Sequence, residues 1–352
     1  MQALRLVAAG SDPELLEVPD PEPGPGEVIV RVGGAGACHS DLHLLYEFPA
    51  GAFPSWAPQF TLGHENAGWV HQVGSGVEGL EIGLPVAVYG PWGCGRCARC
   101  AVGIETLCED LEHAPVAGGG GGLGMDGGMA TLLRVPAARH LVALPEGLEP
   151  VVAAPLTDAG LTPYHAIRRS LPKLTADATA VVIGVGGLGH MGIQILKAVS
   201  ACQIVAVDPK PEALALAEQV GADLVLAPEA TAVAEIRAFA HARGADVVLD
   251  FVGSADTIAL GAAVSRSLGD VTVVGIAGGT FGFSFFSTPY EVSLQTTYWG
   301  SRPELVEVLD LAARGLIEPH CSVFSLAEAP DVYRRLREGA LTGRAVIDPT
   351  RG

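Results

Sequence analysis

The sequence predicts an α/β protein in which a strand-rich first region is followed by a doubly wound parallel sheet. Residues 1 to about 154 are rich in glycine and proline, with short apolar runs between turn formers at 26–36 and 83–90, which is typical of β-strands. From about residue 155, strand-like runs alternate with helical patterns, as in βαβ units. The length of 352 residues leaves room for about two domains.

The alternating region supplies the expected elements of the second sheet. Strand-like runs lie at 179–185, 203–208, 246–253 and 270–279. Helical patterns follow them at 190–201, 211–222 and 233–244. Beyond about residue 290 we expect helices at 301–315 and 327–339, and a strand at 343–349 that returns to the first region.

Composition and charge exclude several classes of function. Lys and Arg number 21 and Asp and Glu 39, so the net charge of −18 argues against binding to nucleic acid or to an anionic membrane surface. No apolar run approaches the roughly 20 residues of a membrane-spanning helix, and the first residues lack the apolar core of a secretory signal. Seven cysteines without an export signal disfavour a disulfide framework, so we expect a reducing cytoplasm and thiolates that bind metal.

A glycine motif opens the first helix of the alternating region. The pattern G-x-G-x-x-G follows the apolar strand at 179–183 and consists of Gly184, Val185, Gly186, Gly187, Leu188 and Gly189. The first glycine allows a tight turn, the second lets the backbone approach a pyrophosphate, and the third permits close helix packing. The motif predicts a dinucleotide site, and the alternative is a glycine-rich turn that binds nothing.

Asp208 ends the next predicted strand, 19 residues beyond Gly189. A carboxylate at this place accepts hydrogen bonds from the ribose 2′-hydroxyl and would repel a 2′-phosphate. Lys210 could partly offset that repulsion, but Pro209 stands where a phosphate-binding arginine is expected. The sequence therefore predicts NAD rather than NADP. The glycine run at 118–122, by contrast, is expected to be a flexible loop with no helix behind it to bind a phosphate.

Four cysteines lie close together in the first region. The pattern C-x2-C-x2-C-x7-C consists of Cys94, Cys97, Cys100 and Cys108. Four thiolates at short spacing suit a structural, tetrahedral zinc. An iron–sulfur cluster is the rival, but the bacterial ferredoxin run ends in x3-C-P, whereas the last spacing here is seven residues and Glu109 follows. Cys202 and Cys321 have no ligand-like neighbours, and we expect them in the core.

A second group of candidate ligands is more dispersed. Cys38 lies in the segment GACHSD (36–41), and His64 and Glu65 lie in TLGHENAG (61–68). One cysteine, one histidine and a distant third ligand would form a catalytic zinc site with an open position. From the pattern alone, packing in the core is the alternative, and a lone cysteine or histidine in such a stretch is more often packed than bound to metal.

Five segments together resemble the zinc-dependent medium-chain alcohol dehydrogenases. In chain order they are GACHSD, TLGHENAG, YGPWGCGRC, PLTDAGLTPYHA and VVIGVGGLGHMGIQILKAV. The resemblance covers the whole chain and is strongest to bacterial NAD-dependent secondary-alcohol dehydrogenases. It implies a GroES-like, mainly-β catalytic domain at 1–154 and 293–352, with a structural zinc lobe at about 91–110, and a Rossmann NAD-binding domain at 155–292.

The resemblance also implies a catalytic zinc held by Cys38, His64 and Asp158. The family often has cysteine at the third of these positions, and aspartate occurs in its secondary-alcohol branch. Glu65 would be a supporting or transient ligand, and Asp41 would orient the His64 ring through a hydrogen bond. Together with the four-cysteine lobe, this implies two zinc ions per chain.

Further roles follow from positions that match the family. Ser40 would receive the proton of the zinc-bound alcohol, and the relay would run through the nicotinamide ribose to His43 at the surface. Thr162 and Arg344 match positions that contact the cofactor. Positions that line the substrate cleft are matched by Trp56, Trp92 and Trp299, for which plain core packing is the alternative.

The resemblance implies reversible, NAD-dependent oxidation of secondary and some primary alcohols to ketones or aldehydes. A polyol or sugar-alcohol dehydrogenase is the alternative within the superfamily, but the stretch 48–60 is apolar and aromatic, which favours hydrophobic substrates. A non-catalytic redox sensor that binds zinc and NAD is the alternative from a different class, and the presence of all three ligands argues against it.

The apolar, strand-like segment 284–300 bears on assembly. An exposed edge strand is normally covered, and pairing across a two-fold axis would cover this one. We therefore expect a homo-oligomer, a tetramer more than a dimer. Burial of the segment against its own catalytic domain is the alternative.

Overall fold

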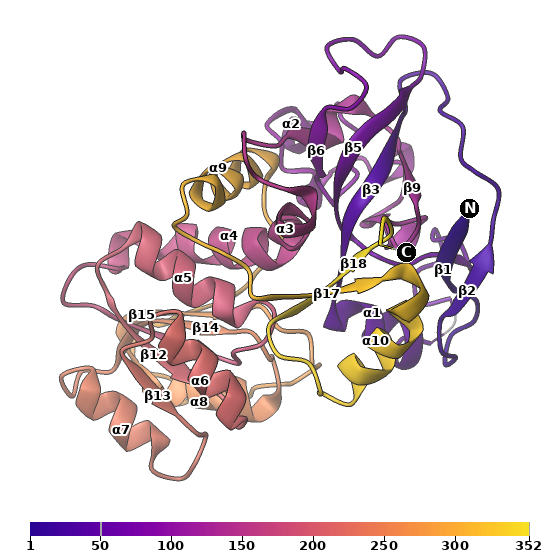
Figure 1. The fold of residues 1–352 in the computed structure, drawn as a ribbon. Helices are drawn as coiled ribbons and strands as arrows, with labels where there is room; N and C mark the ends of the chain where they lie inside the picture. Colours follow the sequence, from indigo (N-terminus) through magenta and orange to yellow (C-terminus); the bar gives the residue numbers. More distant parts are fainter. Residues whose placement is uncertain (50, 352) are drawn as a thin grey trace. The chain divides into compact units, whose positions relative to one another are not determined.

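The computed structural model describes residues 1–49 and 51–351, and these form two compact units (Figure 1). The first unit consists of Met1–Leu161, Trp299–Arg314 and Pro319–Gly352. The second consists of Thr162–Tyr298 and Gly315–Glu318. The first unit is therefore assembled from three stretches of sequence, which matters because its site residues come from more than one of them.

The first unit is built on β-sheets. Among the described residues, its largest sheet has seven strands in the order β10-β6-β5-β3-β18-β17, with β9 paired to β3 beside that path. A smaller sheet has the order β2-β1-β4. The strands are β1 (Gln2–Leu6), β2 (Glu14–Glu17), β3 (Val28–Ala37), β4 (Phe60–Thr61), β5 (Glu65–Val73), β6 (Pro85–Val88), β7 (Gly120–Gly121), β8 (Gly124–Met125), β9 (Leu132–Val135), β10 (Leu141–Ala143), β17 (Cys321–Ser325) and β18 (Arg344–Asp348).

The C-terminal strand pairs with a strand from the beginning of the chain. In Figure 1, β18 in yellow lies beside β3 in violet, and the two are antiparallel, with Val346 opposite Gly36. The prediction that 343–349 returns to the first region is thereby confirmed. The helices of this unit are α1 (His39–Leu42), α2 (Ala98–Ala101), α3 (Pro150–Pro155), α9 (Arg302–Ala313) and α10 (Ala329–Arg337).

The second unit contains a parallel sheet, as the alternation of strands and helices predicts. Its six described strands have the order β13-β12-β11-β14-β15-β16 and are all parallel to their neighbours. They are β11 (Thr179–Ile183), β12 (Gln203–Val207), β13 (Leu224–Leu226), β14 (Ala245–Asp250), β15 (Ser265–Val273) and β16 (Ser293–Thr296). The helices are α4 (Leu161–Ser170), which begins at the boundary of the unit, α5 (Gly189–Val199), α6 (Pro211–Gln219), α7 (Ala232–Phe239) and α8 (Ala255–Val264).

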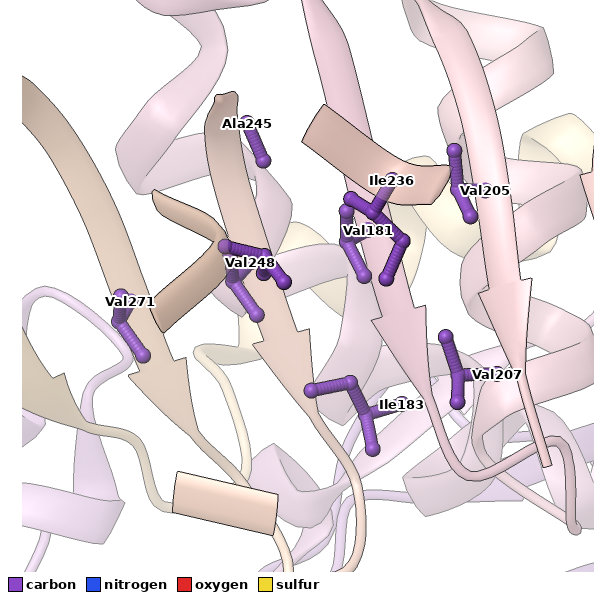
Figure 2. Close-up of a cluster of buried hydrophobic side chains, with 9 residues drawn as sticks. Val181, Ile183, Val205, Val207, Ile236, Ala245, Val248 and Val271 are labelled. Atoms are coloured by element: carbon purple, nitrogen blue, oxygen red, sulfur yellow. The ribbon is translucent and has the colours of Figure 1, made fainter. Parts of the chain in front are cut away.

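The core of this sheet is made of β-branched side chains from neighbouring strands. Figure 2 shows Val181 of β11 between Val248 of β14 and Val205 of β12, with Ile236 of α7 close to them. All four side chains are completely buried. Parallel strands covered by helices read as continuous apolar runs, which is why the sequence pattern identified them correctly.

Two sequence expectations are wrong in detail. Within the apolar segment 284–300, only β16 forms a strand, while Ser284–Ser287 forms a turn closed by a backbone hydrogen bond of 3.1 Å. Pro289 follows this turn and has no N–H to donate to a strand ladder. The glycine run at 118–122, expected to be a loop, contains β7, which pairs with β8.

Cys202 and Cys321, expected in the core, are both partly exposed. Cys202 follows the end of α5, where its thiol lies 3.3 Å from the Ser200 hydroxyl, so it sits at the rim of the sheet rather than inside it. Among the described residues, no helix is both long and apolar enough to cross a membrane.

Candidate active site

The first candidate metal centre brings together Cys38, His64, Glu65 and Asp158. One donor atom from each lies within 4.8 Å of the others, and all four residues are buried. Cys38 Sγ lies 4.0 Å from Asp158 Oδ2, and His64 Nε2 lies 3.5 Å from the same oxygen. The residues that the sequence analysis grouped from distant segments therefore meet in the first unit.

The three donors Cys38, His64 and Asp158 fit zinc. Zinc bonds of about 2.0–2.3 Å in a tetrahedron place neighbouring donor atoms about 3.3–3.8 Å apart, close to the separations found here. Thiolate, imidazole and carboxylate are all common zinc ligands, and three protein ligands leave one position for water or substrate. Such a donor set fits an open zinc site better than a closed, structural one.

A π-helical turn, η5 (Leu156–Gly160), carries Asp158. Such turns are rare and often occur at functional sites. Glu65 holds this turn in place, since its Oε1 accepts a hydrogen bond of 3.1 Å from the backbone N–H of Ala159. Trp299 also contributes, because its indole N–H donates to the carbonyl of Thr157 at 2.7 Å.

Asp41 orients the His64 ring. Its Oδ1 lies 3.0 Å from His64 Nδ1, which leaves Nε2 directed to the other donors. Its Oδ2 accepts a hydrogen bond of 3.1 Å from the backbone N–H of Cys38. Burial lowers the pKa of His64, but the charge of Asp41 and the hydrogen bonds with Asp158, Asp41 and Cys38 together outweigh burial, so the pKa is raised well above its ordinary value.

Tyr333 is a member of this network that sequence reasoning missed. Its hydroxyl donates to Asp41 Oδ2 at 2.6 Å, and the side chain is completely buried. Burial, together with the Asp41 carboxylate, raises the pKa of Tyr333 well above its usual value, so the hydroxyl stays protonated. No sequence signal marks the pair, because the two residues are 292 positions apart and a tyrosine on an amphipathic helix is ordinary.

Glu65 and Arg344 form a buried ion pair in the same unit. Arg344 Nε donates to Glu65 Oε2 at 2.8 Å, and a second hydrogen bond joins Nη2 to Oε1. Burial raises the pKa of Glu65, although the charge of Arg344 opposes this. Gly36 leaves space for the pair, because a Cβ there would lie 1.9 Å from Glu65 Oε2. Arg344, which we expect to contact the cofactor, is thus also the partner of Glu65.

Of the two predicted relay residues, Ser40 lies beside the candidate metal centre and His43 lies below the surface. Ser40 Oγ is 3.4 Å from Cys38 Sγ. His43, expected at the surface, is only 8% exposed; it begins the π-helical turn η1 (His43–Glu47), and its ring lies near those of His39 and Phe48. Its Nδ1 lies 2.5 Å from Glu47 Oε2, and the Glu47 side chain is 60% exposed. The His43–Glu47 pair thus has its exposed end at the Glu47 carboxylate.

The three tryptophans lie in different surroundings. Trp299 packs edge-on against His64, with ring centroids 5.6 Å apart, and adopts a φ of +54°, which is unusual for a bulky residue. Trp56 stacks on Phe53 at 4.1 Å between centroids. Trp92 is 1% exposed and donates its indole N–H to the Tyr89 carbonyl at 3.1 Å. Their predicted roles in substrate binding stay predictions.

The second candidate metal centre is the four-cysteine lobe. The donor atoms of Cys94, Cys97, Cys100 and Cys108 lie within 4.8 Å of one another. Backbone N–H groups point at the sulfurs, as from Cys97 to Cys94 at 3.3 Å and from Cys94 to Cys108 at 3.3 Å. Four thiolates with no place for water match a closed, structural zinc site.

The thiols of this lobe differ in pKa, because hydrogen bonds dominate at Cys97 and burial dominates at Cys100. Backbone N–H groups of Cys100 and Glu109 hold the pKa of Cys97 down to about 6. Burial raises the pKa of Cys100 above its usual range. A metal ion would favour the thiolate form of both, because ligands must lose their protons to bind.

The second unit contains the predicted dinucleotide motif between β11 and α5. Gly184 has a φ of +86°, as a tight turn requires. A Cβ on Gly189 would lie 1.9 Å from the Gly184 carbonyl oxygen, so the helix packs against the turn only because this residue is glycine. A Cβ on Gly186 would meet nothing within 4 Å, which leaves that side open to a pyrophosphate.

Asp208 lies directly after β12 and is already tied to this motif. Its Oδ2 accepts a hydrogen bond of 2.8 Å from the N–H of Val185, and its Oδ1 accepts one of 2.9 Å from the N–H of Lys210. Each carboxylate oxygen can accept more than one hydrogen bond, so capacity for a ribose hydroxyl remains. Thr162 is in the same unit and is 5% exposed.

Comparison with known proteins extends over both units. The GroES-like domain of alcohol dehydrogenases matches residues 24–146, and the zinc-binding dehydrogenase domain matches residues 187–314. An NAD-dependent alcohol dehydrogenase of Sulfurisphaera tokodaii is 35% identical over 99% of this chain and 100% of its own length.

Solved structures agree with this assignment. The alcohol dehydrogenase of Aeropyrum pernix superimposes with a TM-score of 0.90 at 36% identity, covering 99% of this chain and 100% of the other. The D-arabinose dehydrogenase of Sulfolobus solfataricus gives a TM-score of 0.84 at 30% identity, covering 99% of each chain. With its zinc-type ligand sets and its dinucleotide motif, the chain belongs to the zinc-dependent medium-chain alcohol dehydrogenase family of oxidoreductases.

Proposed function

We propose that the protein catalyses the reversible, NAD-dependent oxidation of secondary and some primary alcohols to ketones or aldehydes. The observation that carries this proposal is the convergence of Cys38, His64 and Asp158, three different zinc donors that leave one coordination position open. We further propose a second, structural zinc in the four-cysteine lobe. The first unit would be the catalytic domain and the second the coenzyme domain.

Bound zinc supplies Lewis-acid chemistry, which lowers the pKa of an alcohol or polarises a ketone. The residues around the site position the proposed zinc ligands. Asp41 engages Nδ1 of His64, so that Nε2 is the ring nitrogen directed to the metal position, and the Glu65–Arg344 pair holds the turn that carries Asp158. Trp299 packs edge-on against the His64 ring, and both side chains are buried.

The second unit would hold NAD. Gly184, Gly186 and Gly189 allow the backbone at the start of α5 to approach the pyrophosphate, and the helix N-terminus favours its charge. Asp208 would accept a hydrogen bond from the ribose, and its charge would disfavour NADP. NAD accepts the hydride when the alcohol is oxidised.

Proton transfer falls to two residues of the first unit. Ser40 Oγ, beside Cys38, would take up the hydroxyl proton of the substrate. His43 would exchange protons with solvent, with Glu47 as the exposed group at its Nδ1. Arg344 and Thr162 keep their proposed contacts to the cofactor.

The preference for hydrophobic substrates rests on aromatic side chains of the first unit. Phe48 contacts Phe53 edge-on at 5.2 Å between centroids, and Phe53 stacks on Trp56. Apolar surfaces of this kind favour apolar alcohols and ketones over polyols. The structural likeness to a D-arabinose dehydrogenase keeps a sugar or sugar alcohol as the second candidate substrate.

The test is the formation of NADH, followed by absorbance, with 2-propanol, 1-phenylethanol and D-arabinose. The proposal expects activity with both alcohols, loss of activity after chelation, and recovery on adding zinc. Activity with the sugar alone would favour the second candidate. Bound zinc and NAD without turnover of any substrate would instead favour a redox sensor.

We also propose a homo-oligomer, with a tetramer favoured. This rests on β16, which lies at the end of its sheet, and on exposed aromatic side chains in the segment before it, including Phe285 at 72% and Phe286 at 85% exposure. A cytoplasmic location is proposed as well, supported by the seven cysteines, all of which are free thiols. Sedimentation analysis would test the assembly.

A further inference from the structure

The Asp41 carboxylate has two oxygens with different tasks. Oδ1 serves His64 Nδ1, and Oδ2 accepts hydrogen bonds from the Tyr333 hydroxyl and from the Cys38 backbone N–H. Asp41 and Tyr333 are completely buried, and His64 is 2% exposed. A buried carboxylate needs hydrogen-bond donors to remain charged and fixed.

Tyr333 is the donor that comes from outside the local segment. The Cys38 N–H is part of the same turn as Asp41, at the start of α1, and moves with it. Tyr333 belongs to α10, which Figure 1 shows in yellow next to α1. The hydrogen bond of 2.6 Å therefore ties the Asp41 side chain to a second, independent element.

We propose that Tyr333 is a positioning residue for the catalytic metal, which fixes the Asp41 carboxylate so that it holds His64 in the ligating tautomer and orientation. The proposal rests on the proposed zinc site at Cys38, His64 and Asp158. Without the tyrosine hydroxyl, Asp41 keeps a single donor on Oδ2 and can rotate away from His64 Nδ1. Groups that orient a metal-binding histidine typically change metal affinity about 10–100-fold when they are removed.

The experiment uses the zinc-loaded protein and the variant Tyr333→Phe, which removes one oxygen atom and keeps the ring. Zinc release to a chelator is followed with a colorimetric indicator, and the cobalt-substituted protein is followed by its visible absorption. We expect zinc to leave the Cys38 site about 10-fold faster in the variant, with an altered cobalt band. Release from the four-cysteine lobe should be unchanged, which serves as an internal control.

Tyr89→Phe is the matched control variant. Tyr89 is also completely buried in the first unit, and its hydroxyl donates one hydrogen bond, of 2.7 Å, to the Gly300 carbonyl. A general loss of stability would appear in both variants as a lower melting temperature. Faster zinc release confined to Tyr333→Phe supports the positioning role.

A double-mutant cycle with Asp41→Asn adds a second measurement. If Tyr333 acts through Asp41, the effect of Tyr333→Phe on zinc release should shrink when it is combined with Asp41→Asn. Equal effects with and without Asp41→Asn would overturn the inference, as would unchanged or slower release from Tyr333→Phe alone. A wild-type protein that binds no cobalt outside the four-cysteine lobe would overturn the proposed zinc function itself, and the inference with it.

Discussion

The two candidate metal centres of the first unit are built in opposite ways. The lobe takes its four thiols from residues 94–108 and surrounds them with backbone N–H groups of the same loop. The other centre takes its donors from residues 38, 64 and 158 and holds them with side chains, Asp41, Tyr333 and the Glu65–Arg344 pair.

The difference shows that a metal site can be supported either by its own loop or by side chains from distant segments. A loop whose own backbone points at the thiols can be completed by metal alone, and it leaves no open position. Ligands from distant segments need buried charged partners to hold them, since an unpaired charge in the interior is costly. We therefore expect damage to the lobe to reduce stability, and damage to the second centre to reduce activity.

The largest effect is expected from Asp158→Ala. Loss of this proposed zinc ligand should lower kcat/KM at least about 10³-fold, because Lewis-acid catalysis contributes several kcal/mol and each 1.4 kcal/mol is about tenfold in rate. The melting temperature should change little, since the Asp158 charge raises the pKa of buried Glu65 and its removal relieves that repulsion. Steady-state rates with 1-phenylethanol and calorimetry measure both.

Asp331→Ala is the control for this prediction. Asp331 is an exposed carboxylate on α10 that pairs with Arg334, and exposed pairs contribute only about 0–1 kcal/mol. Its rate and melting temperature should stay near those of the wild type. If Asp158→Ala retained full activity, the dispersed centre would not be catalytic.

Cys97→Ser should produce the reverse pattern. Removal of one thiolate opens the lobe, so the zinc content should fall by one ion per chain relative to the wild type. The melting temperature should drop by about 5–10 °C, because metal binding contributes to folding and each kcal/mol shifts the melting temperature of a chain of this size by a few degrees. Elemental analysis and calorimetry check this, and a stable variant that lacks only activity would contradict the comparison.

The smallest effect concerns pH and His140, which lies beside the lobe with its ring 6.0 Å from that of Trp92. Burial, with the charges of Arg139 and Arg302, lowers the pKa of His140 to about 3. Among the described residues, neither ring nitrogen has a hydrogen-bond partner. The folded state therefore holds this histidine neutral.

The sign of the pH dependence follows from the lowered pKa. Below pH 6.5 His140 is protonated in the unfolded chain but stays neutral in the folded state. The free energy of unfolding therefore falls as the pH decreases from 6.5 toward 3. His140→Phe removes that loss. When the pH falls from 7.5 to 5, the wild type should lose about 2 kcal/mol more unfolding free energy than the variant does. Urea titrations at both pH values measure it, and parallel losses in the two proteins would refute it.

Much of the fold could be predicted because its signals are local. The runs predicted at 179–185 and 203–208 contain β11 and β12, which end at Ile183 and Val207, since a parallel sheet buries both faces and demands continuous apolar sequence. The ends of a strand are harder to predict where they depend on the neighbouring strand that is available for pairing. In 284–300, strand structure is confined to Ser293–Thr296, where β15 offers a partner.

Some features of this protein are encoded entirely by a short stretch of chain. The glycine motif at 184–189 and the four cysteines of 94–108 are of this kind, because turn geometry and thiol spacing depend on neighbouring residues. The groups that hold the dispersed ligands, in contrast, are selected by tertiary packing. Tyr333 meets Asp41 across 292 positions, and Arg344 meets Glu65 across 279. These partners supply hydrogen bonds and opposite charge to buried carboxylates. Because the carboxylates become buried only when the chain packs, the short segments that contain them do not reveal their partners.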